Sequence, residues 1–88
     1  MTTSEKEKIQ YMIDFGKFAR EDLNDLNDFP YGESGTYFLL NAVLIYDHES
    51  ELTEIIEELE LEGQAISPSA VAAKIRIKTG FEKPKLHN

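Results

Sequence analysis

Residues 37–46 read YFLLNAVLIY, a nearly continuous apolar run, and this run decides the fold class. Ten residues are long for a β-strand, and leucine and alanine form helices better than strands. The run also stays in phase with the residues after it, because Phe38, Ile45, Leu52 and Leu59 recur at seven-residue spacing. Apolar residues on all sides of a helix indicate burial. The run therefore predicts a buried central helix.

The segment before this run predicts a long amphipathic helix. Ser4 and Glu7 fit a capping box at its start, and apolar residues then recur every three or four positions. Pro30 restricts the residue before it to extended conformations, so we expect the helix to end by about Asp28. Gly16 within the helix indicates either a close approach of a second helix or a slight kink.

The segment after the run predicts two further helices. A break near residues 47–50 separates the buried helix from a glutamate-rich, surface helix that ends at Gly63. We favour this break over one continuous helix. Ser67 at the N-cap and Pro68 at the first helical position begin the last helix, which stops near Gly80.

These elements predict one all-α domain, a compact bundle of three to four helices over residues 1–80, followed by a short basic tail, residues 81–88. The alternative is an α+β fold in which residues 37–46 form a strand, paired with residues 74–78. The all-α interpretation predicts a core formed by Ile13, Phe18, Leu23, Phe38, Leu40, Val43, Leu44, Leu52, Ile55, Ile56, Leu59 and Val71.

The composition excludes most catalytic equipment. The 88 residues contain no cysteine, which rules out disulfide scaffolds, thiolate metal sites and cysteine nucleophiles. His48 has Asp47, Glu49 and Glu51 beside it, but it lacks the His-x-x-x-His spacing of a zinc helix. There is no glycine-rich phosphate loop either. We therefore expect neither an enzyme nor a bound metal or cofactor.

The N-terminal sequence has mixed charge and no apolar region typical of a signal peptide. The longest apolar run is about half of the roughly 20 residues that a membrane-spanning helix needs. We expect a cytoplasmic protein without membrane contacts.

The charge is distributed unevenly along the chain. Seventeen acidic and nine basic residues give a net charge of −8, with −12 in residues 1–62 and +4 in residues 63–88. Within residues 49–62 there are seven glutamates and no basic residue, and like charges at helical spacing repel. One interpretation is a solubilising face that is partly neutralised by the C-terminal lysines. The other is a docking surface for a cationic protein.

The second interpretation predicts the site residues. We assign partner binding to an acidic ridge formed by Glu51, Glu54, Glu58 and Glu62. A column of aspartates flanks it, namely Asp22, Asp25 and Asp28, and Tyr31 of the loop at residues 29–35 completes the site. The predicted function is a small non-enzymatic regulator or inhibitor that masks a basic or nucleic-acid-binding surface of its partner. A phage or mobile-element origin fits such a protein.

Two other functions stay open. The first is a DNA-binding regulator that uses the basic helix at residues 67–79, because residues 61–75 resemble the entry to a helix-turn-helix motif. Too few residues come after Gly80 for a recognition helix, and the acidic remainder disfavours direct nucleic-acid binding. The second is a structural subunit of a larger assembly. Self-association as a homodimer is also expected, because the chain carries many aromatic residues for its size, including Tyr11, Phe15, Tyr31, Tyr37 and Tyr46.

Overall fold

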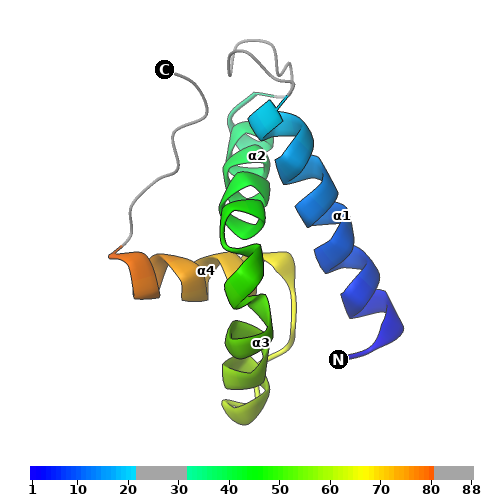
Figure 1. The fold of residues 1–88 in the computed structure, drawn as a ribbon, viewed down its shortest axis with the longest axis vertical. Coiled ribbons are helices and arrows are strands. Elements are labelled where there is room, and N and C mark those ends of the chain that lie inside the picture. Colours follow the sequence, from blue (N-terminus) through cyan, green and yellow to red (C-terminus); the bar gives the residue numbers. More distant parts are fainter. Residues whose placement is uncertain (22–31, 81–88) are drawn as a thin grey trace.

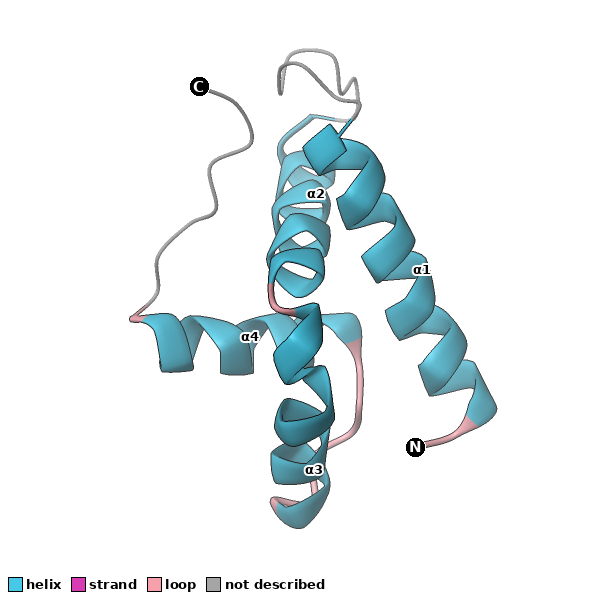
Figure 2. Ribbon diagram, in the orientation of Figure 1, coloured by secondary structure: helices cyan, strands magenta, loops and turns pink. Residues whose placement is uncertain are grey.

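The described part of the chain, residues 1–21 and 32–80, is helical in this computed structural model. Four α-helices succeed one another, with a short 3₁₀ turn, η2, between the second and third (Figure 1); they are α1 (Thr3–Glu21), α2 (Gly32–Asp47), η2 (Glu49–Glu51), α3 (Leu52–Leu61) and α4 (Pro68–Thr79). Figure 2 shows no strand in these residues. The all-α prediction is confirmed, and the alternative of a strand at residues 37–46 is wrong.

Helices α2 and α3 succeed each other along the long axis of the molecule, α1 lies beside α2, and α4 runs across them (Figure 1). Helix α2 packs against both α1 and α4, and α3 packs against α4. The predicted break lies between α2 and α3, where His48 has left the helix. Its ring Nδ1 lies 2.9 Å from the Leu44 carbonyl oxygen, so the side chain folds back on the end of α2.

The described core is apolar and joins all four helices. Six predicted core residues are buried, namely Val43, Leu44, Leu52, Ile55, Leu59 and Val71. Several other buried residues are absent from the prediction, namely Ile9, Met12, Ala19, Leu39, Ala42, Ile45, Ile66, Ala72 and Ile75. Ile13, Leu40 and Ile56 are half-buried, and Leu23 lies outside the described residues. Two core predictions are wrong, because Phe18 and Phe38 are 45% and 39% exposed.

The reason for the exposed phenylalanines is the small-residue contact between α1 and α2. A Cβ atom placed on Gly16 would lie 2.7 Å from the Ala42 carbonyl carbon and 2.7 Å from the Tyr46 Cβ atom. The two backbones therefore meet at Gly16, which confirms the first of its two interpretations. Ala19 is three positions from Gly16 on α1, and Ala42 lies opposite Gly16 on α2; both alanines are fully buried. Small residues of α1 therefore face α2, and the rings of Phe18 and Phe38 lie at the edge of this helix contact.

A capping box starts α1, but two residues earlier than predicted. The Thr2 hydroxyl accepts a hydrogen bond from the Glu5 backbone N–H (3.1 Å), and a Glu5 carboxylate oxygen accepts one from the Thr2 N–H (2.7 Å). The prediction of Ser4 as N-cap is therefore wrong. The other Glu5 oxygen accepts a hydrogen bond from the Ile66 N–H (3.1 Å), which ties the start of α1 to the loop before α4.

The predicted ends of α3 and α4 are confirmed. Gly63, at a φ of +73°, comes after α3, and the backbone N–H groups of residues 63 and 64 donate to the carbonyls of residues 60 and 59. This pairing is a Schellman motif. Ser67 caps α4 by accepting a hydrogen bond from the Ala70 N–H (3.1 Å), Pro68 occupies the first turn, and Gly80 ends the helix at a φ of +78°.

Candidate functional site

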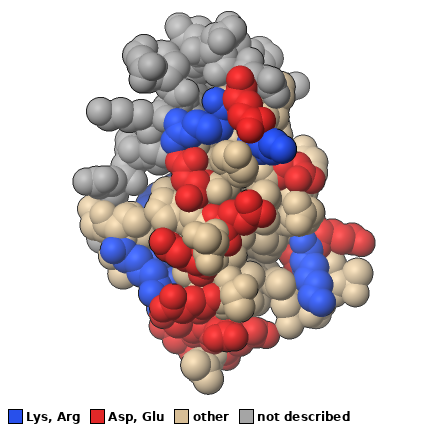
Figure 3. Space-filling model, viewed as in Figure 1, with Lys and Arg blue, Asp and Glu red and all other residues tan. Residues whose placement is uncertain are grey.

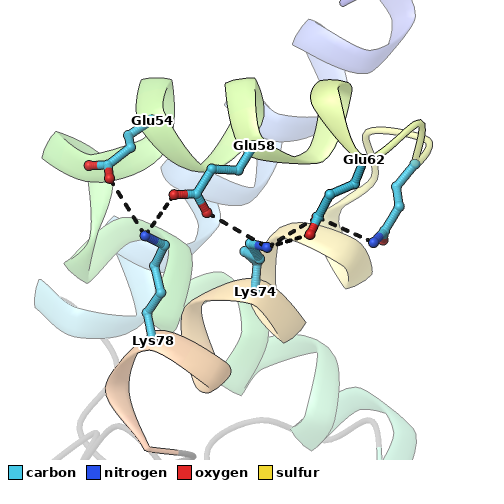
Figure 4. A network of polar contacts seen from close by, with 6 residues as sticks. Glu54, Glu58, Glu62, Lys74 and Lys78 are labelled. Atoms are coloured by element: carbon cyan, nitrogen blue, oxygen red, sulfur yellow. Dashed lines mark hydrogen bonds and ion pairs between the residues drawn. The ribbon is translucent and has the colours of Figure 1, made fainter.

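Three of the four acids of the predicted ridge face lysines of α4. Lys74 Nζ lies 2.8 and 3.0 Å from the two carboxylate oxygens of Glu62 and 3.7 Å from Glu58. Lys78 Nζ lies 3.0 Å from Glu58 and 3.6 Å from Glu54 (Figure 4). We call these five residues the α3–α4 ladder. Glu58 stands at its centre, within ion-pair distance of both lysines.

The electrostatics of the ladder result from this geometry. A hydrogen bond from the Lys78 ammonium, assisted by the charges of both lysines, lowers the pKa of the Glu58 carboxyl. Hydrogen bonds to Glu62 and Glu58 raise the pKa values of Lys74 and Lys78, respectively. Residues 49–62 contain no basic residue, but Glu54, Glu58 and Glu62 have compensating bases on α4. The bases come from 12 to 24 positions further along the chain, because α4 folds back onto α3.

This pairing also determines the expected effect of charge reversal. The sequence alone predicts that replacing Glu54 and Glu58 by lysine preserves or raises stability, because it removes like-charge repulsion within the helix. In the structure, the new lysines would stand beside Lys78, and Lys74 would lose one of its two acidic neighbours. We therefore expect the reversal to lower stability.

The remaining predicted site residues fall into two groups. Glu51 lies exposed at the end of η2 and has no basic partner among the described residues. Asp22, Asp25, Asp28 and Tyr31 lie outside the described residues. Acidic side chains gather at the α3 end of the molecule, with basic side chains beside them (Figure 3).

All three bases of α4 in the described chain are engaged within the molecule. Lys74 and Lys78 belong to the ladder, and the Arg76 guanidinium donates a hydrogen bond to the Asn41 side-chain oxygen on α2. Contact with nucleic-acid phosphates would require these side chains to leave their present acceptors. The geometry of α4 therefore does not favour the DNA-binding alternative.

A different surface carries large exposed side chains. Four rings from α1 and α2 form what we call the aromatic face, namely Tyr11, Phe15, Phe18 and Phe38. Three of them are exposed, Tyr11 by 60%, Phe18 by 45% and Phe38 by 39%. Phe15 is half-buried, and its ring centroid lies 5.3 Å from that of Phe38 and 6.0 Å from that of Phe18, both edge-on. The Tyr11 ring lies 6.3 Å from Phe15 and 6.4 Å from Phe38.

A groove of about 410 Å³ adjoins the aromatic face. Its apolar part comes from three helices, with Tyr11 and Met12 on α1, Phe38 on α2 and Pro68 on α4; polar residues of the first turns of α1 complete the lining, namely Ser4, Glu7 and Lys8. Met12 is only 2% exposed, whereas Tyr11 stands out at the edge. The groove and the rings form one continuous surface through Tyr11 and Phe38.

Part of this surface is predictable from the sequence. The aromatic content of the chain names Tyr11 and Phe15 among the aromatic residues that a small domain has trouble burying, but the core prediction includes Phe18 and Phe38. The spacing of the rings on α1, at positions 11, 15 and 18, is the spacing of a helix stripe and gives no indication of which side is covered. The small residues Gly16 and Ala19 are the available signal for the covered side.

Further properties of the described residues bear on function. No group of three or more His, Asp or Glu side chains within residues 1–21 and 32–80 is arranged to hold a metal ion. None of the helices in these residues has both the length and the apolar character needed to cross a membrane. Comparisons with protein-family models, curated proteins and solved structures gave no significant match. The surface itself is therefore the basis for a functional proposal.

Proposed function

We propose that this protein is a non-enzymatic regulator or inhibitor that binds another protein and covers part of its surface. The observation that carries the proposal is the aromatic face. Three of the seven large apolar side chains that are exposed in the described chain lie on it, namely Tyr11, Phe18 and Phe38; the other four are Met1, Tyr37, Leu61 and Ile77. Contiguous exposed apolar patches mark interaction sites on soluble proteins, whereas isolated exposed residues are ordinary.

The chemistry of these rings fits a protein partner. Aromatic residues are enriched at protein interfaces and supply much of their binding energy, because they bury a large area with few rotatable bonds. Tyr11 also has a hydroxyl that can form a hydrogen bond at the rim of an interface. The rings contact one another, so the face is a preformed platform whose side chains need little ordering on binding.

The net charge gives the sign of the partner surface. At −8 the chain repels nucleic acid and attracts basic protein surfaces. The ladder partly neutralises one side of α3, while Glu51 and Glu57 stay exposed without a basic partner among the described residues. We expect these acids to speed association by long-range attraction, and the aromatic face to supply the affinity.

Affinity capture from a lysate of the source organism tests the proposal. The bait proteins are the wild type, a Tyr11→Ser/Phe18→Ser variant and Leu61→Ser, a matched control that removes an exposed apolar side chain from α3. Loss of an aromatic hot spot typically costs about 2 kcal/mol, roughly 30-fold in affinity. We expect the same partner with the wild type and the control, and its loss with the aromatic variant.

Two results would contradict the proposal. One is a specific partner that the aromatic variant retains at undiminished affinity. The other is tight binding of duplex DNA that weakens steeply with salt in a gel-shift titration, which would support the DNA-binding alternative instead.

A further inference from the structure

We infer that the aromatic face and its groove bind a basic amphipathic helix of the partner protein. An apolar side chain of that helix enters the groove between Tyr11, Met12, Phe38 and Pro68, and its basic side chains lie along the acids of α1. This inference rests on the proposed function and adds to it the form and the chemistry of the partner segment.

The groove is large enough for a bulky side chain and is open at the side of the rings. Its volume of about 410 Å³ exceeds the roughly 150 Å³ in which a buried cavity holds benzene. The apolar residues that line it come from three helices of the packed domain, so its shape is set by the fold. Helix-in-groove recognition uses such a preformed apolar seat for the anchor residues of an amphipathic helix.

The surface is elongated along α1, which favours a helix over a small ligand as the binding partner. Ser4, Tyr11 and Phe18 recur at seven-residue spacing on α1, and the first two border the groove. Fourteen residues of helix span roughly 21 Å, which is about four helical turns. Tyr11 and Phe18 provide apolar contacts seven residues apart, the spacing by which one helix lies along another, and Ser4 extends the line as a polar contact.

Acidic residues recur at the same spacing beside this line. Glu7, Asp14 and Glu21 are exposed on α1 at seven-residue intervals, and Glu7 also lines the groove. Helical geometry places them in a row next to Tyr11 and Phe18. Asp14 accepts a hydrogen bond from Gln10 (3.0 Å), and none of the three has a basic partner among the described residues. A helix seated on the rings would bring its flanking residues to this row.

The lysines of α1 do not cancel the row. Lys6 and Lys17 lie on its far side from the aromatic line, by their positions on the helix, and Lys8 lies on the opposite side of that line. The partner helix therefore meets acids along one flank, over the length of α1. Basic residues on that flank of the partner complete the match.

A second copy of this chain fits the surface less well. Two chains of charge −8 repel each other, and in an antiparallel two-fold pairing of α1 the acidic rows of the two copies would face one another. The lysines of α4, which could otherwise pair between copies, are engaged with Glu54, Glu58 and Glu62 within one chain.

Three synthetic 18-residue peptides test the inference. The first is a leucine–lysine peptide with leucine at helical i, i+3, i+4 and i+7 positions, the second has glutamate in place of lysine, and the third is a scramble of the first without an apolar face. Fluorescence anisotropy measures the Kd of each labelled peptide for the full chain at low and moderate salt.

We expect the leucine–lysine peptide to bind at least tenfold more tightly than either control. Tyr11→Ser and Phe18→Ser should each weaken it tenfold or more, and Leu61→Ser should not. Glu7→Gln/Glu21→Gln should weaken it a few-fold and flatten its salt dependence. Tyr11 and Phe18 are 60% and 45% exposed, so these variants keep the core, which circular dichroism checks.

Several results would overturn the inference. Equal binding of the scrambled peptide would show charge attraction alone, and equal binding of the glutamate peptide would remove the charge match. Dimers in light scattering that Tyr11→Ser dissociates would identify a second copy as the occupant. If capture from lysate still depends on the aromatic face while no peptide preference is seen, the inference fails and the proposed function stands.

Discussion

Gly16→Ala should destabilise the protein, although alanine is the better helix former. The new methyl group would lie 2.7 Å from both the Ala42 carbonyl carbon and the Tyr46 Cβ atom, and closer still to the Ala42 carbonyl oxygen. Carbon atoms in good contact are about 3.5–4.0 Å apart, so α1 must move by roughly 1 Å from α2. Because the obstacle is backbone, rotamer changes cannot relieve it.

The magnitude results from two opposing effects. Overpacking of this kind costs about 3 kcal/mol at the upper end of its usual range, and the movement would also loosen the fully buried Ala19, Leu39 and Val43. The helix propensity of alanine returns about 1 kcal/mol. The net loss is about 2 kcal/mol, which is a large share of the stability of a small domain. With a urea m-value of about 1 kcal/mol per molar, the midpoint should fall by about 2 M.

Urea unfolding monitored by circular dichroism measures this shift. Lys17→Ala, one position away on the exposed side of α1, is the matched control and should stay within about 0.5 kcal/mol of the wild type. A higher midpoint for Gly16→Ala than for the wild type would mean that helix propensity decides at this position, and the close approach of α1 and α2 would be refuted.

Three further predictions concern the ladder and the helix ends. The pKa of Glu58 in the folded protein lies below its ordinary 4.5, so Glu58 contributes its full stabilisation above pH 4.5 and loses it as the pH falls through the lowered pKa. The pKa of Lys78 lies above its ordinary 10.5, so Lys78 contributes its full stabilisation below pH 10.5 and loses it as the pH rises through the raised pKa. Denaturant midpoints should therefore be level between roughly pH 5 and 10, with a smaller acid-side decline in Glu58→Gln. The methyl group of Gly63→Ala would touch no neighbouring atom, but the residue would have to keep a φ of +73°. Calorimetry should therefore show a loss of about 1–2 kcal/mol of stability, and an unchanged melting temperature would contradict the left-handed conformation of residue 63. Ser67→Ala should lose about 1 kcal/mol in urea unfolding through its cap, whereas Ser69→Ala should change little; equal effects would argue against the cap.

Local signals in the sequence predict most helix boundaries. Four residues at helix ends act through atoms only a few positions away, so their roles do not depend on the rest of the fold; they are Gly63, Ser67, Pro68 and Gly80. The capping box of α1 shows where such local signals are no longer sufficient. Thr2–Glu5 and Ser4–Glu7 both fit the pattern, and the box that forms is the one whose glutamate also reaches Ile66, 61 positions away.

The candidate site is harder to predict, because it depends on which helices meet. The charge asymmetry of the chain is visible in the sequence, but only the return of α4 onto α3 shows that Lys74 and Lys78 neutralise Glu58 from within. The rings of α1 have the spacing of a core stripe. Tyr11 and Phe18 are exposed because the close contact at Gly16 directs the small residues of α1, and not these rings, toward α2.

The Glu5 carboxylate has a consequence for how the molecule opens. It bonds the first turn of α1 through one oxygen and the Ile66 amide through the other, so that amide is held by a group from the far end of the described chain. When α1 detaches, the Ile66 N–H loses its acceptor at once, even if α4 stays folded. Its hydrogen exchange therefore reports the detachment of α1 alone, whereas the Val71 amide, bonded to Ser67 within α4, exchanges only when α4 itself unfolds. Two backbone amides five residues apart thus separate a partial opening from a global one.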